Sequence, residues 1–138
     1  MKPRFLLDTG PLVAFLNRRD RFHVWALREL NEIEPPLHTC EAVLSEACFL
    51  LRHNPAGQAA VLDLVRDGLL QIGFDLQTEI TSLCRLLRRY RERRISLADA
   101  CLVRMAELHA GSIVLTLDSD FRIYRMNGRQ VVPTRMPA

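Results

Sequence analysis

Two short apolar runs, each ending in an aspartate, constrain the fold of this chain more than any other feature. Residues 4–8 are RFLLD, and residues 112–118 are SIVLTLD. Such runs are typical of strands buried on both faces, as in parallel sheets. Weaker strand candidates lie at 37–39, 69–74 and 130–134. The carboxyl ends of parallel strands share one edge of a sheet, so both aspartates are expected at that edge.

Helical patterns separate these candidate strands. The spacing of apolar residues and the Ala/Leu content predict six helices, at 12–17, 22–33, 40–53, 58–68, 76–94 and 96–111. Pro11 suits the first turn of a helix, and Ser96 is expected to cap the last helix. Alternating strands and helices predict an α/β fold whose parallel sheet is covered on both faces. Because the 138 residues contain neither repeat nor linker, one domain is expected over residues 1–138.

The tripeptide Asp8-Thr9-Gly10 also occurs in aspartic proteases, where it places a catalytic carboxylate. Those enzymes need an all-β, glycine-rich body, whereas this chain has six glycines and a helical middle. The sequence therefore disfavours a protease and favours a buried strand that ends in a functional aspartate.

Composition is that of an ordinary globular protein, with 49% hydrophobic and 25% charged residues. No apolar run approaches the roughly 20 residues that cross a bilayer, and Asp8 comes too early for a signal peptide. A cytoplasmic protein without a membrane segment is expected. The cysteines form no C-x-x-C pair and lie in apolar stretches, which predicts reduced core residues; they are Cys40, Cys48, Cys84 and Cys101. The four histidines lack zinc-site spacing.

Three aspartates lie at or just beyond the two main strands: Asp8, Asp118 and Asp120. Each has a plain structural alternative, because an aspartate after a strand can accept backbone N–H bonds in a turn or cap a helix. For any one of them, capping is the better explanation. Two strands that end in the same way favour a shared acidic site.

Two further acids lie on predicted helices. Glu46 has apolar neighbours at helical spacing, and burying an unpaired carboxylate there is costly. The alternative is a buried ion pair with an arginine. Asp99 lies in the segment SLAD, which fits a capping box with Ser96, yet its helical neighbours form an apolar face. Asp99 can therefore cap the helix, point to the sheet edge, or do both.

Several carboxylates in one cleft repel one another unless a cation lies among them. Hard oxygen ligands suit Mg²⁺ or Mn²⁺, and such ions activate water and shield phosphates. The pattern therefore favours metal-assisted phosphodiester hydrolysis.

Four segments together resemble the PIN domain family, and within it the VapC-type toxin ribonucleases. They are FLLDTGPLVAF, EAVLSEACFLL, ISLADACLVRMAE and VLTLDSDF, in family order and covering residues 4 to about 133. Each segment is weak alone, but four in order are specific.

The resemblance implies a three-layer α/β/α sandwich with a short, mostly parallel central sheet. It implies that Asp8, Glu46, Asp99 and Asp118 form a catalytic metal site for Mg²⁺ or Mn²⁺, with Asp120 as a further ligand. Thr9 and Thr116 are expected to support these ligands. The implied activity is metal-dependent cleavage of single-stranded RNA by the toxin of a type II toxin–antitoxin pair.

Partners are also implied by the resemblance, namely a small antitoxin and a second copy of the chain. The early helices carry apolar residues that either serve such a partner or pack in the core: Leu12, Phe15, Leu16, Trp25 and Leu30.

The run at 85–94 is rich in arginine. Arg85, Arg88 and Arg89 share a helical face opposite the apolar stripe of Ile80, Leu83, Cys84 and Leu87. This face either binds RNA phosphates or is an ordinary solvated surface. Tyr90 either stacks on a base or packs in the core.

Two alternatives for function remain open: a PIN-fold housekeeping nuclease without an antitoxin, and a non-catalytic module that binds RNA or protein.

Overall fold

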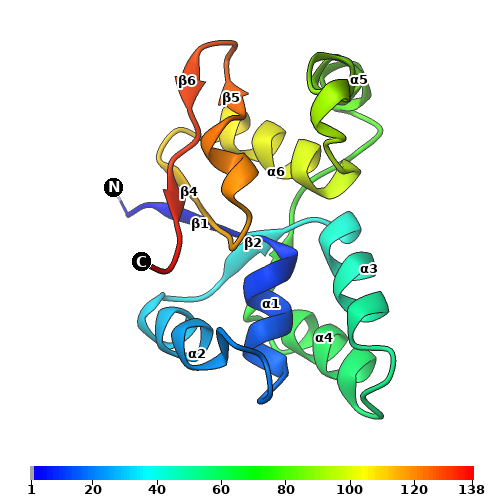
Figure 1. Cartoon of the computed structure of the whole chain (residues 1–138), viewed down its shortest axis with the longest axis vertical. Helices are drawn as coiled ribbons and strands as arrows, with labels where there is room; N and C mark the ends of the chain where they lie inside the picture. The colour runs from blue at the N-terminus through cyan, green and yellow to red at the C-terminus, as the bar shows by residue number, and fades with distance from the viewer. Residues whose placement is uncertain (1) are drawn as a thin grey trace.

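A computed structural model describes residues 2–138 (Figure 1). Its main sheet has five strands in the order β3-β2-β1-β4-β7, and every neighbouring pair is parallel. The strands are β1 (Arg4–Leu7), β2 (Leu37–Thr39), β3 (Leu70–Ile72), β4 (Ser112–Leu115) and β7 (Thr134–Arg135). The expected parallel sheet is confirmed, and β1 and β4 are central neighbours, with Leu7 opposite Leu115.

Six α-helices lie in the expected order. They are α1 (Thr9–Leu16), α2 (His23–Glu32), α3 (Glu41–Leu50), α4 (Gly57–Arg66), α5 (Ile80–Arg89) and α6 (Leu97–Leu108). Helix α1 begins earlier than predicted because Asp8 caps it by accepting a bond from the backbone N–H of Thr9. Helix α5 is shorter than predicted and is followed by a separate 3₁₀ turn, η1 (Arg91–Arg93).

The predicted strand at 130–134 is divided between two sheets. Strand β6 (Gln130–Val131) pairs antiparallel with β5 (Arg125–Met126), while Thr134 and Arg135 join the main sheet as β7. The hairpin turns at Asn127 and Gly128, both with positive φ. An Asn-Gly pair favours such a turn, so the sequence contained a hairpin signal that the strand prediction missed.

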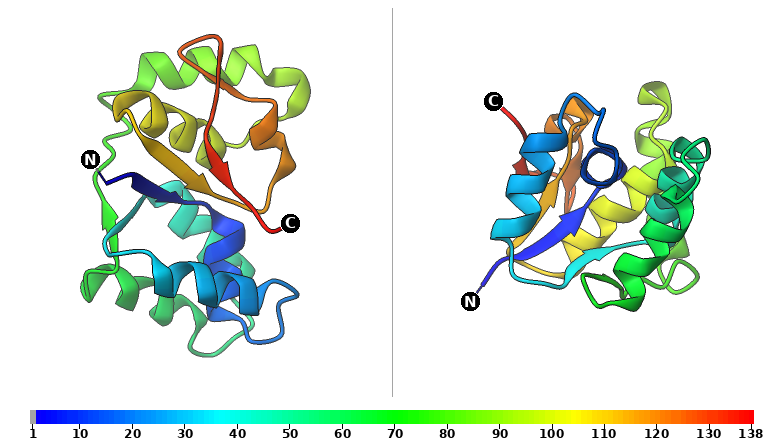
Figure 2. Two further views of the ribbon diagram at one scale, coloured as in Figure 1. Left: turned by 90° about the vertical axis from the view of Figure 1, so that its left-hand side faces the viewer. Right: turned by 90° about the horizontal axis from the view of Figure 1, so that it is seen from below.

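Helices cover both faces of the main sheet. In Figure 1 and the left view of Figure 2, α5 and α6 lie on one side of β1 and β4, and α1 and α2 lie on the other. Helix α3 packs between α1 and α6, and α4 packs on α3. This is the three-layer α/β/α arrangement. Its core includes fully buried side chains from β1, β4 and α6, among them Leu6, Leu7, Val114, Leu115 and Leu102.

The predicted apolar stripe of α5 is partly wrong. Leu83 and Leu86 are buried, whereas Ile80 is 46% exposed and Cys84 is also exposed. Helix α5 packs mainly on α6, so only a narrow face of it is covered. Cys84 is therefore no core residue. Cys40 and Cys101 are buried as expected, Cys48 is half-buried, and all four cysteines are free.

The apolar residues of the early helices also divide. Leu12 and Leu30 belong to the core and cannot form a partner surface, whereas Phe15, Leu16 and Trp25 are half-buried around it. Within residues 2–138, no helix combines the length and apolar character needed to span a bilayer.

Candidate active site

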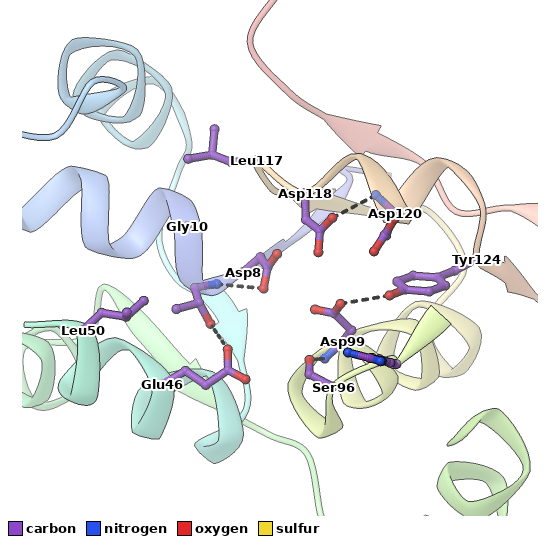
Figure 3. A pocket seen from close by; sticks show the side chains of 12 residues that line it. Asp8, Gly10, Glu46, Leu50, Ser96, Asp99, Leu117, Asp118, Asp120 and Tyr124 are labelled. Carbon is purple, nitrogen blue, oxygen red and sulfur yellow. Dashed lines mark hydrogen bonds between the residues drawn. The ribbon is translucent and has the colours of Figure 1, made fainter. Parts of the chain in front are cut away.

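An open pocket of about 430 Å³ lies beyond the carboxyl ends of β1 and β4 (Figure 3). The structure brings together there all five acids singled out in the sequence: Asp8, Glu46, Asp99, Asp118 and Asp120. They come from the end of β1, from α3, from α6 and from the segment after β4. Residues up to 112 positions apart thus share one pocket because β1 and β4 are adjacent and parallel, and because α3 and α6 flank their ends.

Asp8 is the most enclosed of these acids, with 5% of its surface exposed. Its Oδ1 accepts a bond from the Thr9 backbone N–H at 2.8 Å, and its Oδ2 accepts one from the Thr116 hydroxyl at 2.6 Å. Burial raises the pKa of Asp8 to about 6, although both hydrogen bonds oppose the rise and the charges of Asp118 and Glu46 add to it. Asp8 therefore caps α1 and faces the acidic pocket at the same time.

Glu46 is exposed, contrary to the burial inferred from its apolar neighbours. Of those neighbours, Val43 is buried in the core, whereas Phe49 and Leu50 are 60% and 56% exposed. Glu46 therefore lies where α3 leaves the core and borders the open pocket. The alternative of a buried ion pair is therefore wrong. The Glu46 carboxylate instead accepts a 3.0 Å bond from the Thr9 hydroxyl, which ties α3 to the start of α1.

The segment after β4 is folded by its own polar groups. The Thr116 hydroxyl accepts a 3.0 Å bond from the Asp118 backbone N–H. Oδ1 of Asp118 accepts a 2.9 Å bond from the Asp120 N–H and so begins a 3₁₀ turn, η2 (Ser119–Arg122). Capping and site formation are compatible, because capping occupies only one oxygen of Asp118.

Asp99 is held at the start of α6. Ser96 is the predicted N-cap, and its hydroxyl accepts a 3.0 Å bond from the Asp99 N–H. The Asp99 carboxylate accepts a 3.1 Å bond from the Tyr124 hydroxyl, as Figure 3 shows. Burial, followed by the charges of Asp8 and Asp118, raises the pKa of Asp99 to about 7. The structure thus assigns this carboxylate to the pocket.

Two polar residues of the pocket, Tyr124 and Arg94, are not among the site residues predicted from the sequence. Tyr124 is 1% exposed and packs edge-on against Tyr90 and Phe121, with ring centroids 5.1 and 5.2 Å away. No local pattern in the sequence marks it. Arg94 ends the arginine run just before the Ser96 cap, and this position was the one available signal. Tyr90 is buried, so it packs in the core and is not free to stack on a base.

The donor set of the pocket suits a hard divalent cation. Burial and mutual repulsion raise the pKa values of Asp8 and Asp99, and a bound cation would relieve both effects. Across residues 2–138, no three Asp, Glu, His or Cys side chains are grouped closely enough to enclose a metal ion by themselves. Mg²⁺ does not require such a cage, because it keeps several waters and uses few carboxylates.

Arg85, Arg88 and Arg89 do not line the acidic pocket. They are exposed on α5, and Arg89 donates a 2.9 Å bond to the carbonyl of Gly128 in the β5–β6 hairpin. Arg85 and Arg89 border a different pocket, together with Arg104, Glu107 and Arg125. Their contact with RNA stays a prediction.

Comparison with known proteins identifies the family. The PIN domain profile matches residues 5–126. Ribonuclease VapC26 of Mycobacterium tuberculosis is 25% identical over 115 residues, which are 82% of this chain and 85% of that protein. The crystal structure of M. tuberculosis VapC20, described as a sarcin–ricin loop cleaving toxin, superposes with a TM-score of 0.70 at 22% identity, covering 84% of this chain and 91% of that one. The resemblance and the fold expected from the sequence are therefore confirmed, and the chain belongs to the PIN domain family.

Proposed function

We propose that this chain is a divalent-metal-dependent endoribonuclease that hydrolyses single-stranded RNA, and that it is the toxin of a type II toxin–antitoxin pair. The observation that carries the proposal is the convergence of five carboxylates from four chain segments in one open pocket. Membership of the PIN family and similarity to a VapC ribonuclease support the nuclease activity. The mild net charge of +3 does not oppose a nucleic-acid substrate.

Asp8, Glu46, Asp99 and Asp118 would hold Mg²⁺ or Mn²⁺, with Asp120 as a supporting ligand. Bound there, the ion would stabilise charge on the phosphate and increase the acidity of a water molecule. Thr116 and Thr9 position the carboxylates of Asp8 and Glu46 through hydrogen bonds of 2.6 and 3.0 Å.

Asp99 is the best placed of these acids to handle a proton. In the metal-free protein the pKa of Asp99 is about 7, and a bound cation would lower it, so the carboxylate would be ionised at neutral pH and able to accept a proton from water. Tyr124 donates to one oxygen of Asp99, which leaves the other oxygen to orient a water molecule.

Digestion of a single-stranded RNA tests the proposal directly. Wild type with Mg²⁺ or Mn²⁺ is expected to cleave, whereas wild type with EDTA and Asp8→Asn with metal are expected not to. Circular dichroism must show that Asp8→Asn is folded, which is expected because Asn preserves the size of Asp. Equal metal-dependent cleavage by wild type, Asp8→Asn and Asp99→Asn would refute the proposal. RNA binding that survives both chelation and these substitutions, without cleavage, would favour the non-catalytic module.

The antitoxin is proposed to contact the exposed end of α3. Phe49 and Leu50 present large apolar side chains to solvent beside Glu46. Leu50 also lines both the acidic pocket and a neighbouring pocket of about 620 Å³, so an antitoxin segment bound there would extend toward the carboxylates. Expression of the toxin is expected to arrest growth, and co-expression of the adjacent small reading frame is expected to restore it. A lone gene with no such neighbour would favour the housekeeping nuclease.

The chain is further proposed to form a homodimer. Light scattering coupled to gel filtration would then give twice the chain mass of 15.9 kDa at micromolar concentration. A mass of one chain over that range would contradict this part of the proposal.

A further inference from the structure

Arg94 is the only positively charged residue among the twelve that line the acidic pocket, all of which lie in the described part of the chain. Five of the other eleven are carboxylates. A cation in such surroundings would normally be expected to form a close ion pair.

No such pair is formed. The ion pairs within residues 2–138 involve Lys2, Arg66, Arg91, Arg104 and Arg135, but not Arg94. The Arg94 side chain is exposed at the pocket, and its guanidinium therefore remains available to an anionic ligand.

The backbone of Arg94 has an unusual conformation. Its φ of 54° and ψ of 43° place it in the left-handed region, directly after η1. The Arg94 N–H donates to the Arg91 carbonyl at 3.0 Å, and the Ile95 N–H donates to the Tyr90 carbonyl at 3.5 Å. This is the Schellman arrangement, in which the left-handed position strongly favours glycine.

Arginine at this position works against the local conformational preference. Residues held in strained backbone conformations are concentrated at functional sites, where the surrounding structure fixes them. Here the following residue, Ile95, is buried, and Ser96 caps α6 directly after it. The Arg94 backbone is thus anchored five positions before Asp99.

RNA has to approach this pocket against the repulsion of its carboxylates. A bound metal ion offsets part of that charge, and a guanidinium offers two parallel donors that match phosphate oxygens. Building on the proposed nuclease function, we propose that Arg94 binds a phosphate of the RNA strand in the acidic pocket and positions that strand for cleavage. Arg94 is then a substrate-binding residue of the active site.

Substitution of Arg94 separates this role from a structural one. Arg94→Gly removes the guanidinium and places the preferred residue in the left-handed conformation, so its melting temperature is expected to equal or exceed that of wild type. Its cleavage of single-stranded RNA is expected to fall about tenfold or more, mainly through a higher KM. Arg94→Lys keeps the charge and the strained backbone but loses the two parallel donors of the guanidinium. It is expected to be more active than Arg94→Gly and less active than wild type.

Arg93→Ala is the matched control. Arg93 is also exposed and belongs to the same arginine run, but it does not line the pocket. It is expected to cleave RNA like wild type. An equal loss in Arg93→Ala and Arg94→Gly would mean that only overall charge matters, and would overturn the inference.

A salt series provides a readout that is independent of turnover. In an Asp8→Asn background, binding of a fluorescent single-stranded oligoribonucleotide is measured by anisotropy with Mg²⁺ across a range of NaCl concentrations. Loss of one phosphate contact is expected to reduce the slope of log K against log [NaCl] by about 0.7 for Arg94→Gly, and not for Arg93→Ala. Wild-type affinity, slope and cleavage in Arg94→Gly would overturn the inference. That result would leave the nuclease proposal standing if Asp8→Asn alone abolishes cleavage.

Discussion

The hydroxyl of Thr116 donates a 2.6 Å hydrogen bond to Oδ2 of Asp8, joining residues 108 positions apart in the sequence. The same hydroxyl accepts a 3.0 Å bond from the backbone N–H of Asp118. Thr116 is completely buried, so neither bond is shared with bulk water. One side chain therefore sets the distance between the aspartates that follow the two central strands.

Thr116→Val is expected to destabilise the protein and to reduce RNA cleavage. Valine has the same shape but leaves a buried carboxylate oxygen of Asp8 without its donor, at a cost of about 1–3 kcal/mol in the free energy of unfolding. Urea denaturation and an RNA cleavage assay measure the two effects. Thr116→Ser keeps the hydroxyl and is expected to retain most of the activity. Full activity in the valine variant would show that the bond is not required.

Mg²⁺ is expected to stabilise wild type, because a ligand that binds only the folded state raises its stability. At 100 times the dissociation constant the gain is about 2.7 kcal/mol. Thermal melting with and without Mg²⁺ measures this gain, which should be lost in Asp8→Asn combined with Asp118→Asn. The control is Glu92→Gln, because the Glu92 side chain is 93% exposed and lies on η1, outside the pocket. Equal Mg²⁺ shifts in all three proteins would place the binding elsewhere.

The metal-free protein is expected to lose stability as the pH rises. The pKa values of Asp8 and Asp99 in the folded state are about 6 and about 7, against an ordinary value of 3.8 for an aspartate, so the folded protein binds more protons than the unfolded protein between these limits. The stabilisation that comes from protonated Asp8 and Asp99 is fully present below about pH 4 and is lost as the pH rises through about 6 to 7. Asp8 alone contributes about 3 kcal/mol of it to the free energy of unfolding.

Urea denaturation in EDTA across this pH range measures the loss, which Asp99→Asn should reduce. Mg²⁺ is expected to stabilise the protein more at pH 8 than at pH 5, because it binds ionised carboxylates. A flat or rising stability profile in EDTA would contradict the assignment of these pKa values.

Tyr124→Phe is expected to shift the pH dependence of cleavage upward. The Tyr124 hydroxyl lowers the pKa of Asp99 through its 3.1 Å bond, so its removal raises that pKa and moves the ionisation needed for a general base to higher pH. The shift is measured in a pH–rate profile. Tyr90→Phe is the matched control, since the Tyr90 hydroxyl accepts a bond from the Arg125 N–H and does not contact Asp99. If both variants keep the wild-type profile, Asp99 is not the proton-handling group.

The sequence contained enough to predict the fold and the acidic residues. The apolar runs within Arg4–Leu7 and Ser112–Leu115 identify strands of a covered parallel sheet, and the last two residues of each strand are buried. The rule that parallel strands end at one edge then places Asp8 beside Asp118. Ser96 as the cap of α6 is equally local, since the bond to the Asp99 N–H spans only three residues.

Only the tertiary structure decided the surroundings of each acid. Glu46 lies on an apolar helix whose first part is buried and whose last turn, with Phe49 and Leu50, is exposed. Tyr124 reaches the pocket by packing against Tyr90, which is distant in the chain and which no local periodicity relates to it. Arg94 is placed there by the left-handed turn that joins η1 to α6. Propensity and hydrophobic spacing act over a few residues, whereas exposure, pKa and hydrogen-bond partners depend on which segments meet once the chain has collapsed.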